Sequence, residues 1–146
     1  MGRGDRAVIV VDSSAIVAIL LGEPSATSLV ERLDADDERV LSVAGYVETG
    51  IVLASRRSSN RLSAIGDLDR LLDELGIALA PVDAGQARLA LQARIRFGRG
   101  MGHGGALNYG DSFACALAKT RGAPLLFVGD DFRGTDVLIA LDTATR

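Results

Sequence analysis

The chain has 146 residues, of which 48% are apolar, and its 16 basic and 19 acidic side chains give a net charge of −3. This size suits a single domain over residues 1–146, and the charge excludes general adhesion to nucleic acid through bulk attraction. One cysteine cannot form an intramolecular disulfide, and the longest apolar run, residues 7–21, is too short and too interrupted to span a membrane, so we expect a cytoplasmic protein without membrane contact.

Short apolar strands alternate with helical patterns along the whole chain. In chain order we expect a strand at 7–11, helices at about 13–21 and 23–33, a strand at 39–43, helices at about 44–57 and 62–75, a strand at 77–82, a helix from 84 to about 97, a glycine-rich loop over 98–105, a helix over 108–119 and a strand at 123–128. This alternation predicts a three-layer α/β/α fold around a central, mainly parallel sheet.

Several residues are typical of helix ends. Ser13 or Ser14 can cap the first helix, and Asp83 can cap the helix that follows the third strand. Gly76 stands where the clearest amphipathic helix, residues 62–75, should stop. In a parallel sheet, sites form beyond the carboxyl ends of the strands, so residues at these junctions are candidates for function.

The helix over residues 84–97 carries an apolar stripe and a group of arginines. Its spacing predicts that Ala87, Leu91 and Ile95 face the core. Four arginines lie within twelve residues that contain no acid, namely Arg88, Arg94, Arg96 and Arg99. They form either a solvated helix face or a rim that binds phosphate groups.

Acidic residues adjoin the predicted core in four regions. Asp12 ends the first strand, Glu48 is the one charge from residue 40 to residue 55, and Asp111 precedes an apolar helix. Asp130 and Asp131 follow the last strand. The order of the elements lets these groups converge at one edge of the sheet.

A buried carboxylate must become neutral, pair with a cation or bind a metal, because uncompensated loss of hydration is costly. No Lys or Arg lies in residues 7–21 or 40–55. A hard divalent ion such as Mg²⁺ satisfies several carboxylates together. The alternative is that each acid caps a helix or accepts loop amides.

Other chemistries have little support in the sequence. One histidine and one cysteine cannot build a conventional zinc site, and there is no nucleophile elbow or Walker loop. Gly100, Gly102 and Gly105 fit the spacing of a nucleotide-binding loop but follow a helix instead of a strand. His103 in this loop is either incidental or a contact for a substrate phosphate.

Three segments together resemble the acidic motifs of PIN domains, particularly those of VapC toxins. In order they are VIVVDSSAIVAIL, SVAGYVETGIVL and LNYGDSFACALAKTRGAPLLFVGDDF. The likeness covers about residues 8–138, and its specificity lies in the order and spacing of the set. The resemblance implies a PIN fold, divalent-ion-dependent endoribonuclease activity, a homodimer, and inhibition by a VapB-type antitoxin as partner.

Carried over by position, the resemblance implies that Asp12, Glu48 and Asp111 are the first three acids of the site. Many relatives separate their final acids, whereas Asp130 and Asp131 are adjacent here, so position alone does not fix the fourth acid. Asp130 is favoured, with Asp131 as the alternate. Asp12 and Asp111 would hold Mg²⁺, or Mn²⁺ as the alternative, and the ion would activate water and offset phosphate charge. Glu48 and Asp130 would ligate a second ion or deprotonate the water, and the sequence leaves one metal or two open.

The RNA would be held at the rim of the acidic site. Ser13 either orients a metal-bound water or caps its helix. The candidate phosphate contacts are Arg94, Arg96, Arg99 and His103.

Two rival interpretations remain open. Asp12 could be the nucleophile of a phosphatase, although position 14 is Ser14 and the second acid of such a motif is missing. The chain could also be a non-catalytic interaction module that binds a structural ion.

Overall fold

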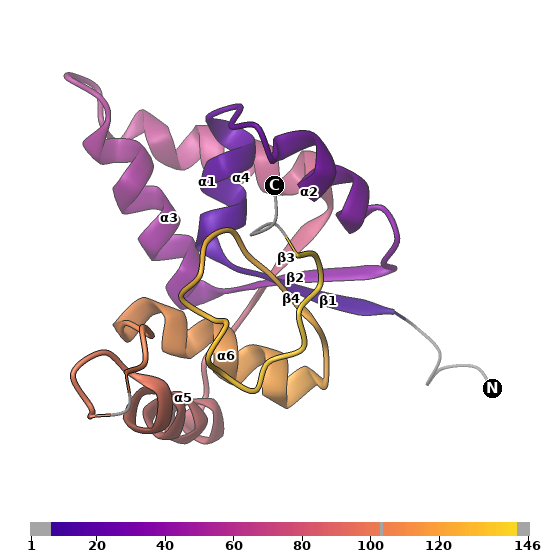
Figure 1. Ribbon diagram of the computed structural model, residues 1–146. Coiled ribbons are helices and arrows are strands. Elements are labelled where there is room, and N and C mark those ends of the chain that lie inside the picture. Colours follow the sequence, from indigo (N-terminus) through magenta and orange to yellow (C-terminus); the bar gives the residue numbers. More distant parts are fainter. Residues whose placement is uncertain (1–6, 103, 143–146) are drawn as a thin grey trace.

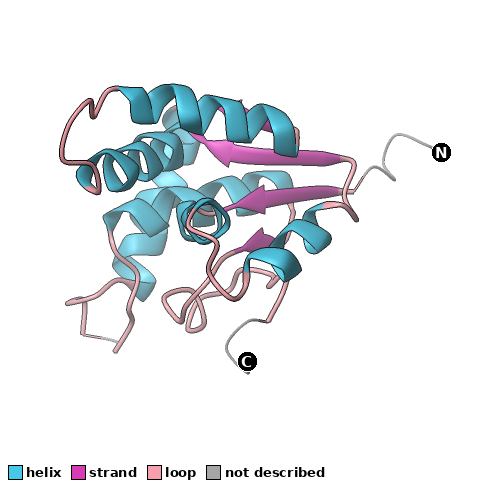
Figure 2. Ribbon diagram, turned by 90° about the horizontal axis from the view of Figure 1, so that it is seen from above, coloured by secondary structure: helices cyan, strands magenta, loops and turns pink. Residues whose placement is uncertain are grey.

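The strands pair side by side in the computed structural model, which describes residues 7–102 and 104–142. In these ranges the sheet has four strands in the order β3-β2-β1-β4, and every neighbouring pair is parallel. The bounds are Val8–Val11 for β1, Glu38–Ser42 for β2, Ile77–Ala80 for β3 and Leu125–Leu126 for β4. The strand arrows in Figure 2 point the same way, so their carboxyl ends share one edge of the sheet.

Helices connect the strands. Their bounds are Ser13–Leu20 for α1, Ala26–Leu33 for α2, Val43–Ser55 for α3, Ser63–Leu75 for α4, Ala84–Phe97 for α5 and Tyr109–Arg121 for α6. The cap of α1 is Asp12, not Ser13 or Ser14 as expected, because its side chain accepts a hydrogen bond from the Ser14 N–H. Asp83 caps α5 as predicted, and Gly76 ends α4 with a φ of 66°.

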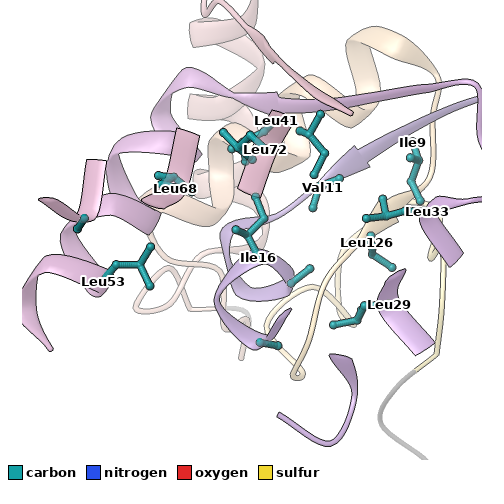
Figure 3. Close-up of a cluster of buried hydrophobic side chains, with 14 residues drawn as sticks. Ile9, Val11, Ile16, Leu29, Leu33, Leu41, Leu53, Leu68, Leu72 and Leu126 are labelled. Atoms are coloured by element: carbon teal, nitrogen blue, oxygen red, sulfur yellow. The ribbon is translucent and has the colours of Figure 1, made fainter. Parts of the chain in front are cut away.

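The sheet lies between two layers of helices, which confirms the predicted three-layer α/β/α fold (Figure 1). On one face, Ile9, Val11 and Leu41 pack against α1, α2, α3 and α4 (Figure 3). On the other face, Val10 and Val40 pack against α5 and α6. Alternate residues of β1 thus enter opposite cores, as the pleat of a strand requires.

The inner face of α5 differs from the predicted one. Leu91 is 61% exposed, Ile95 is 51% exposed and Ala87 is also exposed, whereas Ala90 and Ala93 are buried. The buried alanines pack in the same core as the small residues of α6, and α5 and α6 are close neighbours. Small side chains let the two helices approach closely, so the larger apolar residues of α5 remain outside.

The last strand is shorter than the predicted run over residues 123–128. Leu125 and Leu126 pair with β1, and Leu125 also bridges to Ile139. Val128 leaves the ladder, and its N–H instead donates a 3.0 Å hydrogen bond to the Ser14 hydroxyl. The chain therefore turns away from the sheet just before Asp130 and Asp131.

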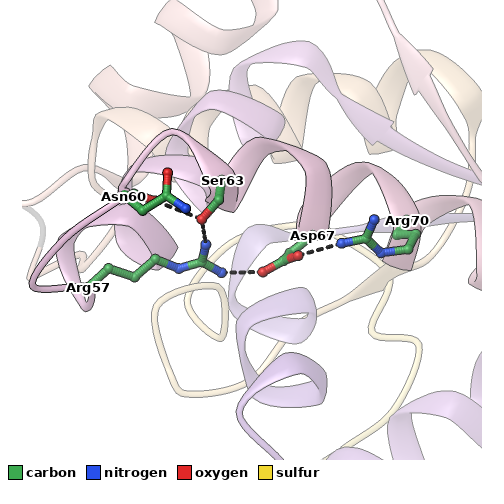
Figure 4. A network of polar contacts seen from close by, with 5 residues as sticks. All are labelled: Arg57, Asn60, Ser63, Asp67 and Arg70. Carbon is green, nitrogen blue, oxygen red and sulfur yellow. Dashed lines mark hydrogen bonds and ion pairs between the residues drawn. The ribbon is translucent and has the colours of Figure 1, made fainter.

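A polar network closes the turn between α3 and α4 (Figure 4). The Arg57 guanidinium donates to Ser63 and Asp67, and Arg70 donates to the other oxygen of Asp67 at 2.5 Å. The Ser63 hydroxyl donates 2.6 Å to the Asn60 carbonyl. These contacts fix the direction in which α4 leaves α3, the helix that carries Glu48. None of the helices in the described ranges has the length and apolar character needed to cross a bilayer.

Candidate active site

Asp12 lies directly after β1, at the carboxyl edge of the sheet. Its residue is only 4% exposed, and one carboxylate oxygen accepts a 3.0 Å hydrogen bond from the Ser14 N–H. The local sequence explains this position, because an apolar strand ends where an acid can cap the next helix. The cap places a carboxylate at the centre of the sheet edge, between the ends of β2 and β4.

Asp111 enters the same edge from the first turn of α6. Asn108 and Asp111 form a reciprocal capping box, in which the Asn108 side chain accepts from the Asp111 N–H at 2.8 Å. The Asp111 carboxylate accepts from the Asn108 N–H at 3.0 Å. The box fixes the side chain, which is almost fully buried. The N-x-x-D spacing at 108–111 is the sequence signal for this contact, whereas position 108 alone predicts only the start of a helix.

Glu48 reaches the edge from α3 and contacts two other helices. The Ser13 hydroxyl on α1 donates a 2.8 Å hydrogen bond to Glu48 Oε1. The Glu48 carboxylate also lies against the backbone of Gly110 at the start of α6. No pattern in the sequence indicated that Ser13 or Gly110 contacts Glu48, since the contacts join segments far apart in the chain.

The electrostatics show that the acids face one another. Burial, together with the nearby charge of Glu48, raises the pKa of Asp12 from 3.8 to about 6 despite hydrogen bonds from Ser14 that lower it. Burial also raises the pKa of Asp111 from 3.8 to about 7, with added repulsion from Asp12, Asp131 and Glu48. Within the described ranges, no Lys or Arg forms an ion pair with Asp12, Glu48 or Asp111. The site therefore holds negative charge that a cation would stabilise.

The two adjacent acids after β4 point in different directions. The Asp130 side chain is 80% exposed and pairs with Arg133 at 3.2 Å. Asp131 is partly buried, and its charge contributes to the raised pKa of Asp111, whereas Asp130 is not among the causes of that shift. Gly129 has a φ of 100°, which turns the chain immediately before the pair. The structure thus brings the alternate, Asp131, toward the cluster and leaves the favoured Asp130 at the surface.

Arg96, one of the predicted phosphate contacts at the rim, contacts an aromatic ring and an acid. Its guanidinium stacks over Phe97 and faces Asp136 at 3.8 Å. Asp136 also binds Lys119, which lies two turns beyond Asp111 on α6, about 12 Å along the helix axis. The charge of Arg96 is therefore paired with Asp136 near Lys119, at the end of α6 opposite Asp111.

The other predicted phosphate contacts have varied surroundings. Arg94 folds against Gly98, and its Nη1 atom is buried without a hydrogen-bond partner. Arg99 is exposed, and its backbone N–H donates to the Leu107 carbonyl at 2.9 Å, just before α6 begins. His103 lies outside the described residues. Arg99 is therefore held near the end of α6 that carries Asp111.

The residues present fit a small, hard cation. Carboxylate oxygens are the donors that Mg²⁺ prefers, and Mg²⁺ usually keeps several waters beside one or two protein carboxylates. In residues 7–102 and 104–142, no three His, Cys, Asp or Glu side chains are arranged so that they could hold a metal ion by themselves. Burial raises the pKa of the Cys115 thiol to about 12, so this neighbour of Asp111 stays protonated and is not a thiolate ligand.

Curated relatives match nearly the whole chain. VapC42 ribonuclease from Mycobacterium tuberculosis is 46% identical over 129 residues, which cover 88% of this chain and 96% of that protein. VapC28 ribonuclease from the same species is 46% identical over 134 residues and 92% of this chain, or 98% of its own length. A VapC ribonuclease from Mycolicibacterium smegmatis is also 46% identical, over 88% of this chain and 97% of that protein.

Solved structures share the fold at lower identity. VapBC2 of Rickettsia felis, bound to a promoter DNA fragment, has a TM-score of 0.69 and 16% identity over 90% of this chain and 96% of that one. VapC20 of M. tuberculosis, a toxin that cleaves the sarcin-ricin loop, has a TM-score of 0.68 and 17% identity over 89% and 96%. The PIN domain family model matches residues 9–138. The resemblance seen in the sequence is thereby confirmed, and the chain belongs to the PIN domain family, within its VapC type.

Proposed function

We propose that this protein is the ribonuclease toxin of a toxin–antitoxin pair and hydrolyses RNA phosphodiester bonds with Mg²⁺, or with Mn²⁺ as the alternative. The observation that carries the proposal is the group of Asp12, Glu48 and Asp111 at one sheet edge, buried or partly buried without a cationic partner in the described ranges. The ribonuclease names of the 46% identical relatives support the reaction type.

Asp12 and Asp111 would hold the ion, because their carboxylates are the most deeply buried of the cluster. The ion would lower the pKa of a bound water and offset charge on the phosphate. Glu48 orients the attacking water and accepts its proton. Asp131 is the fourth acid of the cluster, in place of Asp130, since its negative charge contributes to the raised pKa of Asp111.

The RNA backbone is held at the rim by Arg99, on the loop that leads into α6. A cluster of carboxylates repels a polyanion until a cation binds, so substrate binding and metal binding support each other. Ser13 acts on the reaction through its hydrogen bond to Glu48.

The proposed partner is a VapB-type antitoxin, and the proposed assembly of the toxin is a homodimer. Support for the antitoxin comes from the structural neighbours, several of which are VapBC proteins, including VapBC-5 of M. tuberculosis with a TM-score of 0.59. The homodimer follows from the resemblance to VapC toxins. Copurification with the antitoxin and sedimentation of the free toxin test these two points separately.

The decisive experiment measures RNA cleavage by the purified, antitoxin-free protein with Mg²⁺, with Mn²⁺ and with a chelator. Asp12→Asn and Asp111→Asn are the test variants, because asparagine keeps an oxygen that can accept the capping hydrogen bond. We expect each variant to lose more activity than the ~10–100-fold that removal of an outer-shell partner costs. The melting temperature should not fall, since each change removes a buried charge.

Cleavage that survives both substitutions, or that proceeds fully in chelator, would refute the proposed mechanism. A protein that binds Mn²⁺ and antitoxin but cuts no RNA would support the non-catalytic module instead. Asp73→Asn, on the exposed side of α4, is the matched control because it removes one acid far from the cluster in the sequence and should keep full activity.

A further inference from the structure

Gly110 is the second residue of α6, and its backbone gives no reason for a glycine. Its φ is not among the positive values found in the described ranges, so any residue can adopt this conformation. Glycine is also less favourable than alanine within a helix. The reason for glycine must therefore lie in what surrounds this position.

The Glu48 carboxylate fills the space that a side chain at Gly110 would need. A Cβ built there would lie 2.2 Å from Glu48 Oε2, 2.7 Å from its Cδ and 2.9 Å from its Oε1. These separations are shorter than non-bonded atoms tolerate. Even the methyl group of alanine would therefore force Glu48 to move.

Glu48 is also held by a hydrogen bond from Ser13. The Ser13 hydroxyl donates 2.8 Å to Oε1, the same oxygen that lies 2.9 Å from the Cβ position at Gly110. A new side chain that displaced the carboxylate would therefore distort this hydrogen bond, because the displaced group includes the bonded oxygen. The three residues come from α1, α3 and α6, so the contact fixes Glu48 relative to the helices that carry Asp12 at their start and Asp111.

We propose that Gly110 and Ser13 are positioning residues that together hold the Glu48 carboxylate in its working orientation. Gly110 acts by having no side chain, and Ser13 acts by donating a hydrogen bond. This inference rests on the proposed function, in which Glu48 orients and deprotonates water. The inference predicts that Gly110→Ala, a change that favours the helix, will lower the rate of RNA cleavage.

Gly66 provides a matched control for this prediction. It also lies inside a helix, in α4, with no positive φ, and a Cβ at Gly66 would meet nothing within 4 Å. Gly66→Ala and Gly110→Ala thus make the same chemical change in a helix. They differ in whether the new methyl group meets Glu48.

The experiment measures kcat and KM for RNA cleavage with Mg²⁺, together with melting temperature, for both alanine variants. For Gly110→Ala we expect kcat to fall about 10- to 100-fold, because a displacement of about 1 Å at a reacting group has this effect. Its melting temperature should stay the same or rise. Gly66→Ala should keep the kcat of the unaltered protein.

A second pair of variants separates positioning from a general disturbance of α6. Glu48→Asp shortens the side chain by one methylene group and withdraws the carboxylate from position 110. Glu48→Asp should lower kcat alone, but the Gly110→Ala and Glu48→Asp double variant should be no less active than Glu48→Asp. Losses that multiply instead would show independent effects and overturn the inference.

Variants of Ser13 test the hydrogen bond to the Glu48 carboxylate. They keep the inference testable even if Gly110→Ala fails to fold. Ser13→Ala should lower kcat about 10-fold at constant KM, and Ser13→Thr should retain most of the activity because it keeps the hydroxyl. Gly110→Ala or Ser13→Ala with an unchanged kcat would overturn the inference for that residue. Failure of the unaltered protein to cut RNA would instead refute the proposed function.

Discussion

The Ser14 hydroxyl accepts a 3.0 Å hydrogen bond from the N–H of Val128, 114 residues later in the chain. β4 has only two residues, so this hydrogen bond attaches the chain to the start of α1 after the strand pairing has ended. It ties the start of α1, next to Asp12, to the segment that turns at Gly129 toward Asp131. One hydroxyl thus joins the first and last acidic segments of the site.

Ser14→Ala should lower the free energy of unfolding by about 1–2 kcal/mol, because a partly buried N–H loses its acceptor. Urea denaturation of the metal-free protein measures this change. Ser59→Ala, at an exposed position between α3 and α4, is the control and should leave stability unchanged. Equal stability of the two variants would mean that the bond contributes nothing to the fold.

Without metal, the protein should become less stable as the pH rises from about 4 to about 7. Burial raises the pKa of Asp12 to about 6 and that of Asp111 to about 7, above the ordinary value of 3.8. The folded protein therefore binds more protons than the unfolded chain in this window, and its stability falls as these protons leave. Thermal melting in chelator at several pH values tests the sign.

Asp111→Asn should flatten this dependence because it removes one of the two titrating groups. Asp67→Asn is the control, since hydrogen bonding from Arg57 lowers the pKa of Asp67, so Asp67 is ionised in folded and unfolded chains across most of the window. A melting temperature that rises with pH between 5 and 7 in the unaltered, metal-free protein would contradict the prediction.

Asp131→Asn should lower RNA cleavage more than Asp130→Asn does. Asp131 contributes to the potential at Asp111, whereas the exposed Asp130 pairs with Arg133 at the surface. Initial rates at saturating Mg²⁺ and the Mn²⁺ dependence of the rate provide the comparison. The reverse order of the two variants would restore Asp130 as the fourth acid of the site.

Arg99→Gln should weaken RNA binding and reduce the slope of log affinity against log salt concentration by about 0.7 to 1, as expected for one lost phosphate contact. Fluorescence anisotropy with labelled RNA measures both quantities, with Asp12→Asn in the background to prevent cleavage. Arg96→Gln should change the slope less, because Arg96 faces Asp136 near the far end of α6. A slope that Arg99→Gln leaves unchanged would exclude Arg99 as a rim contact.

The sequence alone predicted the layers of the fold and three acids of the candidate site. Apolar runs of five or six residues that alternate with helical patterns indicate a parallel sheet, and the structure has that sheet. Asp12 and Asp111 could be found because each lies at a boundary that local sequence defines, the end of a strand and the first turn of a helix. Glu48 could be found because its surroundings are uncharged.

Tertiary structure alone decided which of several equivalent residues face the site. Asp130 and Asp131 are adjacent and chemically identical, but Asp131 is partly buried whereas Asp130 is exposed and pairs with Arg133. The apolar spacing of α5 indicated Leu91 as buried, but close packing of small residues against α6 selected Ala90 and Ala93 instead. Local sequence determines where an element begins and what it carries, whereas the face it presents depends on the shapes of partners that fold in from far along the chain.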